Sequence, residues 1–136
     1  MTSHISNPTP PLNLLPTYQV GRYMESLATA HLVKQGVSIL HQNFYCRLGE
    51  IDLIVRDKEY LVFVEVRYRT QSSFCDAKST VTYAKQQKIR RVAAFFLQKH
   101  RQYRHCFCRF DVVGIDSDQS NKGQELSIEW IKGAFE

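Results

Sequence analysis

The chain has 136 residues, of which 43% are hydrophobic and 23% are charged, a composition typical of one globular domain. The net charge of +5 and the pI near 9.1 suit an anionic partner such as nucleic acid, although many basic proteins bind none. No run approaches the roughly 18 apolar residues that span a bilayer, and no signal peptide is recognisable. Membrane and secreted proteins are therefore not expected.

Four cysteines are present at positions 46, 75, 106 and 108, and none forms a Cys-x-x-Cys pair. Cys106 and Cys108 would share one face of a strand, but a zinc site would need further ligands nearby. Free thiols in a reducing compartment are the favoured interpretation. We therefore expect a cytoplasmic protein.

The first 16 residues contain all four prolines and no lysine or arginine. We expect them to form a flexible leader, followed by a single domain over residues 17–136. From about Tyr18 to Gln35 the apolar residues recur with helical spacing, and Gly36 is well placed to end this helix. Glu25 lies beside the apolar stripe. It is either a first-turn acid stabilised by the helix dipole or part of a functional site.

Two strongly apolar runs follow at residues 49–55 and 61–67, joined by a polar link of hairpin length. β-Branched and aromatic residues dominate both runs, which predicts two buried strands. Before them, residues 37–40 predict a short strand or an extended connection. The polar residues 41–43 then interrupt the pattern, so the hairpin is expected to begin near Phe44.

Three charged residues lie inside these apolar runs. Period-2 alternation places Glu65 and Arg67 on one face of the second strand. Asp52 comes near Glu65 if the hairpin register sets the two roughly opposite, which the link length permits. Because an unpaired buried charge is costly, these residues need counter-charges or a metal ion.

The polar stretch 70–79 is expected to be a mobile loop, and a long helix is predicted at about 81–100. Lys85 lies on the centre line of the apolar stripe of this helix. It either snorkels to solvent or faces the sheet and pairs with a carboxylate. Residues 106–115 predict a strand parallel to the one before the helix, which completes a β-α-β unit. Residues 126–131 predict an edge strand.

Carboxylates on neighbouring strands repel each other, by on the order of 4 kcal/mol at about 4 Å and an effective dielectric constant near 20. Mg²⁺ reverses the sign, since it binds a few carboxylate oxygens together with water and substrate phosphate. Such an ion activates a water molecule and stabilises charge on a phosphodiester oxygen, and a nearby cation balances the pentavalent phosphate. An acid on one strand and Glu-x-basic on the next are therefore consistent with a nuclease site.

The run Gly-Glu-Ile-Asp-Leu-Ile at residues 49–54, followed by Leu-Val-Phe-Val-Glu-Val-Arg-Tyr-Arg at residues 61–69, resembles the YraN family. This bacterial family is placed in the PD-(D/E)XK nuclease-like superfamily and is similar to Holliday-junction resolvases. The resemblance covers most of the chain apart from the leader and the C-terminal end. The other matching positions are Glu25, Asn43, Lys85, Lys88–Arg91 and Arg109–Val112.

The resemblance implies an α/β fold with a restriction-endonuclease-like core, in which helices flank a mixed β-sheet in the order helix, β-hairpin, helix, strand, strand. It also implies a DNA endonuclease that uses Mg²⁺, or Mn²⁺ as a substitute, and that is structure- or junction-specific. A homodimer is compatible with it, because similar resolvases cut two strands symmetrically. The implied metal ligands are Asp52, Glu65 and Glu25; the catalytic residues are Asp52, Glu65, Arg67 and Lys85; the nucleic-acid contacts are Arg67, Arg69, Lys85, Lys88 and Arg91.

Arg67 departs from the family pattern, which has lysine at this position. Lysine releases a proton when its pKa is lowered, whereas arginine effectively does not. Arg67 can still orient a water molecule or stabilise phosphate charge, and Lys85 would approach from the helix side. Three hypotheses stay open: a metal-dependent nuclease, a nucleic-acid-binding protein of the same fold that cuts slowly or not at all, and a buried ion-pair network without a ligand.

Overall fold

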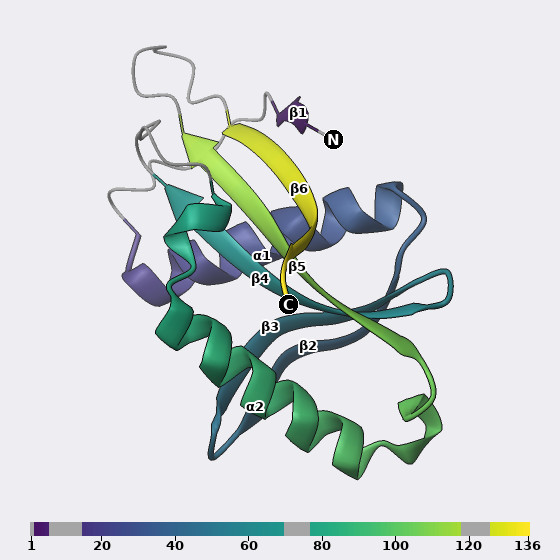
Figure 1. Ribbon diagram of the computed structural model, residues 1–136. Helices are drawn as coiled ribbons and strands as arrows, with labels where there is room; N and C mark the ends of the chain where they lie inside the picture. The colour runs from purple at the N-terminus through teal and green to yellow at the C-terminus, as the bar shows by residue number, and fades with distance from the viewer. Residues whose placement is uncertain (1, 6–14, 70–76, 118–125) are drawn as a thin grey trace.

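The computed structural model describes residues 2–5, 15–69, 77–117 and 126–136. In these parts of the chain a six-stranded mixed sheet, in the order β1-β6-β5-β4-β3-β2, is flanked by two α-helices (Figure 1). The protein thus has the expected α/β architecture. The elements are β1 (Thr2–Ile5), α1 (Thr17–Lys34), β2 (Ser38–Cys46), β3 (Gly49–Asp57), β4 (Tyr60–Arg69), the 3-10 turn η2 (Lys78–Thr80), α2 (Tyr83–Lys99), the 3-10 turn η3 (Arg101–Tyr103), β5 (Phe107–Ser117) and β6 (Leu126–Phe135).

The described sheet has one pair of parallel neighbours, and this pair lies at its centre. Strands β2, β3 and β4 are antiparallel neighbours, β4 and β5 are parallel, and β6 is antiparallel to both β5 and β1. The predicted β-α-β unit is confirmed as β4-α2-β5. The prediction of an edge strand at residues 126–131 is wrong, because β1 pairs with the other side of β6. The turn between β3 and β4 is also shorter than predicted, since the two strands reach Asp57 and Tyr60.

Strand β1 adds structure within the expected leader. Residues Thr2–Ile5 pair with β6, while residues 1 and 6–14 lie outside the described residues, so the division into leader and domain stays a prediction. Of the predicted loop at 70–79, residues 70–76 likewise lie outside, and Lys78–Thr80 form a 3-10 turn.

The predicted break at residues 41–43 is also wrong, because β2 runs without interruption from Ser38 to Cys46. Two backbone irregularities in β2 accommodate the polar residues 41–43. The register with β3 shifts between Ile39 and His41, and Asn43 adopts a φ of 53°. A bulge and a left-handed asparagine are both tolerated in an edge strand, and neither is visible in an alternation pattern.

Residues at the helix ends explain where α1 begins and ends and where α2 begins. Pro16 precedes α1, and Gly36 follows it with a φ of 92°, a conformation that only glycine adopts without strain. The side-chain oxygen of Thr82 accepts a hydrogen bond from the Lys85 backbone N–H at 3.2 Å and caps α2.

Each helix covers one face of the sheet with its own apolar core. On the α1 face, Met24 and Leu32 pack in one cluster with Val64. On the α2 face, Ile89, Val92 and Phe96 pack in a second cluster that includes Leu61 and Phe63. Burying each of these side chains stabilises the fold by about 1.5–3 kcal/mol. The alternation predicted for β4 is therefore confirmed.

Neither α1 nor α2 has the length and hydropathy of a membrane span, and these are the α-helices of the described residues. Cys46, Cys106 and Cys108 are free thiols, as predicted. Cys75 lies outside the described residues.

Candidate metal and nucleic-acid site

The sheet divides at Asp52. β3 pairs with β4 only as far as Leu53 opposite Val64, and the remainder of β3 pairs with β2 alone. The carboxylate of Asp52 fills the gap, because its Oδ2 accepts a hydrogen bond from the Val66 N–H at 2.8 Å. A backbone donor that would lose its strand partner is thereby satisfied, and the Asp52 side chain is held at this point, the fork between β3 and β4.

Side-chain alternation along β3 changes phase at the same point. Ile51 and Ile54 both pack in the α2 core, whereas Leu53 packs in the α1 core. Strict alternation would place Ile51 and Leu53 on one face. The phase change leaves Asp52 near both faces, where residues from α1, β3 and β4 reach it.

Glu65 follows Val64 and so lies across the fork from Asp52. Its side chain is 6% exposed. Burial and the negative charge of Asp52 raise the pKa of Glu65 from 4.5 to about 8. Lys85 Nζ and Arg67 Nη1 lie 3.8 Å and 3.6 Å from its Oε1. These separations exceed hydrogen-bond length, so the two cations compensate the buried charge only in part.

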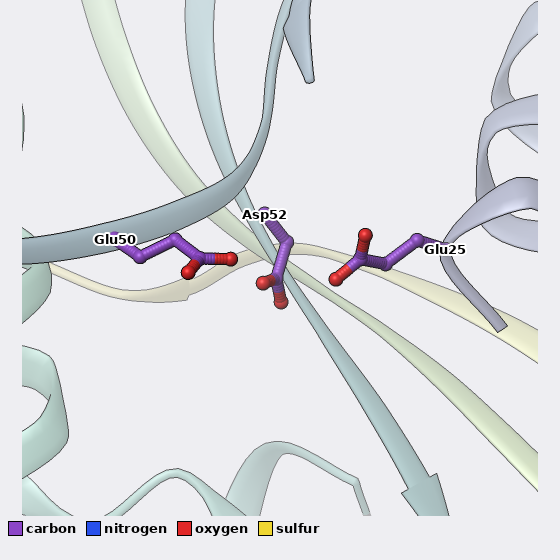
Figure 2. A group of neighbouring side chains, drawn as sticks. All are labelled: Glu25, Glu50 and Asp52. Atoms are coloured by element: carbon purple, nitrogen blue, oxygen red, sulfur yellow. The ribbon is translucent and has the colours of Figure 1, made fainter. Parts of the chain in front are cut away.

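Asp52 also belongs to a second group of acids on the α1 side. One carboxylate oxygen from each of Glu25, Glu50 and Asp52 lies within 4.8 Å of the others. Figure 2 shows Asp52 between the other two, with all three carboxylates turned toward one another. Burial raises the pKa of Asp52, and the charge of Glu50 raises it further, despite the hydrogen bond from Val66.

The pKa of Glu25 is raised as well, first by burial and then by the charge of Asp52, and a hydrogen bond with the Asn43 side chain opposes the shift. The raised pKa values of Asp52 and Glu25 indicate a deficit of positive charge around these two carboxylates. Carboxylate oxygens are the ligands preferred by Mg²⁺ and other hard cations. Two oxygens on one Mg²⁺ lie at most about 4.2 Å apart, twice a bond of about 2.1 Å. Small side-chain rotations would therefore close this group on an ion.

Arg67 is held in place by a turn from the neighbouring segment. Its Nε donates to Thr80 Oγ1 and its Nη2 to the Thr80 carbonyl, both at 3.1 Å. Gly114, opposite Arg67 in the β4–β5 register, makes this possible, since a Cβ there would overlap Ala77. The turn therefore packs closely on β5 and fixes the direction of the guanidinium.

The other predicted contacts fall in different places. Arg69 forms a two-point ion pair with Asp116 at 2.7 Å and 2.8 Å, which occupies its guanidinium. Lys88 and Arg91 are exposed on α2, where a nucleic acid could contact them. The predicted residues that gather around the fork are Glu25, Asp52, Glu65, Arg67 and Lys85.

Two residues at the fork were absent from the predicted site. Glu50 lies two residues before Asp52 in the same strand, and this spacing was the available signal. Asn43 was noted only as a match to the family. Its contact with Glu25 depends on a left-handed backbone, for which the residues around it give no signal.

These features define an α/β protein whose mixed sheet divides at a cluster of carboxylates able to hold a metal ion. Residues 24–115 match the family model described as "Uncharacterised protein family UPF0102", and this range contains every residue of the fork. The chain is therefore a member of the UPF0102 family, as its resemblance to YraN implied.

Full-length relatives support the assignment. Over 120 residues the chain is 43% identical to a UPF0102 protein of Alkalilimnicola ehrlichii, covering 88% of this chain and 89% of the relative. It is 44% identical to a UPF0102 protein of Coxiella burnetii, with 88% and 94% covered. It is 42% identical to one of Legionella pneumophila, with 88% and 97% covered.

Proposed function

We propose that the protein is a divalent-metal-dependent nuclease that hydrolyses phosphodiester bonds in DNA, built on a restriction-endonuclease-like core. The observation that carries this proposal is the fork itself. Asp52 and Glu65 face each other with raised pKa values, and two further acids and two cations lie around them. A structural ion-pair network would pair its acids with hydrogen-bonded cations, and in the described parts of the chain these four acids have none.

The five predicted residues of the fork each have a role in this hydrolysis. Asp52, Glu65 and Glu25 would hold Mg²⁺ or Mn²⁺, which activates a water molecule and stabilises the charged phosphate. Lys85 lies beside Glu65 and would contact the scissile phosphate. Arg67 is directed by Thr80 and would stabilise the pentavalent phosphate, but it cannot remove a proton from the water.

The surface supports a nucleic-acid substrate. The net charge is +5, and Lys88 and Arg91 are exposed on the helix that carries Lys85. Phosphate contacts of this kind release counterions, so affinity would fall steeply as salt increases. Structure- or junction-specific cutting by a homodimer belongs to the same proposal.

A second candidate is a nucleic-acid-binding protein that cuts slowly or not at all. The observation that favours it is Arg67, which replaces the motif lysine and is tied to Thr80 by two hydrogen bonds. In this case DNA and metal both bind, and the strand stays intact.

The test combines metal binding with cleavage. Mg²⁺ or Mn²⁺ should raise the melting temperature, since a ligand at 100 times its Kd stabilises the folded state by about 2.7 kcal/mol. Asp52→Asn with Glu65→Gln should abolish this rise and any cleavage of branched, flapped or linear DNA. The amide oxygen that Asp52→Asn introduces can still accept the Val66 N–H, so the fold should persist.

Glu59→Gln with Glu129→Gln is the matched control, because it removes two exposed acids away from the fork. This control should keep both the melting-temperature rise and the cleavage. Metal and DNA binding without cleavage would select the second candidate. If neither metal stabilises the wild-type protein and no DNA binds to it, only the ion-pair network remains.

A further inference from the structure

A pocket of about 210 Å³ adjoins the carboxylates between α1 and β2. Leu53 is buried at its base, and the polar walls include Ser26 and Gln42. Glu25 lines the pocket and also belongs to the acid cluster, so the two sites are contiguous. Pockets for drug-sized ligands measure roughly 300–1,000 Å³. This one fits a single flat ring system better than a whole nucleotide.

The charges around the pocket indicate a neutral ligand. Arg22 and Glu25 are the charged side chains in its lining, and the positive charge of Arg22 lowers the pKa of Glu25. Arg22 therefore compensates the charge of Glu25 in part. A phosphate group would meet one cation that is partly neutralised and one carboxylate that repels it.

The polar walls match the edge of a nucleobase. Gln42 offers an amide donor and an amide acceptor. The hydroxyls of Ser26 and Thr29 donate to the carbonyls of Tyr23 and Glu25 at 2.6 Å and 2.8 Å, which leaves their oxygens free to accept. Unpaired bases are recognised by such donors and acceptors on their edges, with apolar contact to the ring face. The Leu53 side chain would supply that contact.

We infer that this pocket binds the base of an unpaired nucleotide adjacent to the scissile phosphate. The inference rests on the proposed function and narrows its substrate class. In an intact duplex the base must first leave the stack, at a cost of a few kcal/mol. Single-stranded, flapped or branched DNA presents such a base without this cost and is the preferred substrate.

Ser26→Phe tests the inference, because it fills the pocket from an exposed position of α1 and leaves Glu25 unchanged. Ser26→Ala is the matched control. The probe is a flapped duplex whose branch point fixes the register, prepared with one abasic position at a time and bound with Ca²⁺ in place of Mg²⁺. One abasic position should weaken binding to the wild type and to Ser26→Ala by about 5- to 150-fold, the value of one base contact. Ser26→Phe should bind all probes alike.

Gln42→Ala, with exposed Gln98→Ala on α2 as its control, gives a second measurement should Ser26→Phe fail to fold. Gln42→Ala should shrink the position-specific loss, and Gln98→Ala should keep it. A flat abasic profile in a wild-type protein that still binds the flap and gains stability with Mn²⁺ overturns the pocket inference alone. Absence of both DNA binding and metal stabilisation removes the proposed function, and the inference with it.

Discussion

Asp111 and Glu65 are buried carboxylates on the neighbouring strands β5 and β4, but their surroundings differ. Asp111 has no exposed surface, and its oxygens accept hydrogen bonds from the Arg109 guanidinium, the Trp130 indole N–H and the Gly133 backbone N–H at 2.8–3.0 Å. Among the described residues, the cationic nitrogens nearest to Glu65 lie at 3.6 Å and 3.8 Å, and its side-chain hydrogen bond is with another acid, Asp52. The negative charge of Asp111 is therefore fully compensated by hydrogen-bond donors, whereas that of Glu65 is compensated only in part.

The hydrogen-bonded cluster around Asp111 extends to a second acid. Arg109 also donates to Asp57 at 2.8 Å and lies over the Tyr60 ring, 5.0 Å from its centroid. Burial alone would raise the pKa of Asp57, but the hydrogen bond from Arg109 and the charge of Lys132 hold it below its ordinary value. Burial of charge therefore does not distinguish Glu65 from Asp111. Incomplete compensation of its charge does.

The largest effect is expected from breaking the hydrogen-bonded cluster around Asp111. Asp111→Ala leaves Arg109 without its main partner in the interior, and it should lower the free energy of unfolding by about 3–5 kcal/mol. Urea denaturation with and without Mn²⁺ measures this, and the loss should be the same in both. Asp116→Ala, which breaks the more exposed pair with Arg69, should cost only about 0.2–1 kcal/mol. Equal losses in the two variants would contradict the comparison.

At the fork, loss of a charge should have the opposite sign. Glu65→Gln removes an ionised carboxylate that the fold disfavours, so without metal at pH 9 it should raise the free energy of unfolding. The full pKa shift corresponds to about 5 kcal/mol at about 1.4 kcal/mol per unit, and the cost of burying the introduced amide, about 1–3 kcal/mol, should reduce the gain to about 2–4 kcal/mol. Urea denaturation in a chelator checks this. A decrease would show that Lys85 and Arg67 fully compensate Glu65, and that the fork is an ordinary ion-pair network.

The smallest expected effect is the change in the free energy of unfolding per pH unit. Because the pKa of Glu65 rises from 4.5 in the unfolded chain to about 8 in the fold, its contribution is fully present below pH 4.5 and is lost as pH rises toward 8. Melting temperatures without metal should therefore show a falling component across this window. Glu65→Gln should remove it, and saturating Mn²⁺, which binds the ionised form, should flatten it. An unchanged slope in Glu65→Gln would exclude Glu65 as its source.

Periodicity in the sequence predicted much of this architecture. The alternation along β4 placed Glu65 and Arg67 on one face, which is the face that α2 covers. The stripe of α2 left two possibilities for Lys85, solvent or the sheet, and Lys85 lies beside Glu65. The edge of the sheet was mispredicted for physical reasons. The pairing of β1 with β6 joins residues far apart in the chain, and the bulge in β2 leaves no periodic trace.

The fork could be predicted only in part. Asp52 and Glu65 were predicted because they lie within apolar runs, where an unpaired buried charge is costly. The group formed by Glu25 and Glu50 depends on where β3 leaves β4, which is decided by packing of two cores. In the same way, Trp130 and Gly133, which donate to Asp111, come from β6, so these contacts depend on the pairing of β6 with β5.

The closeness of Gly114 to Ala77 has a consequence for how this protein tolerates change. One methyl group added at Gly114 on β5 would displace the turn that carries Thr80 and let the Arg67 guanidinium move away from Glu65. The orientation of a cation at the fork thus depends on the absence of a side chain on the adjacent strand.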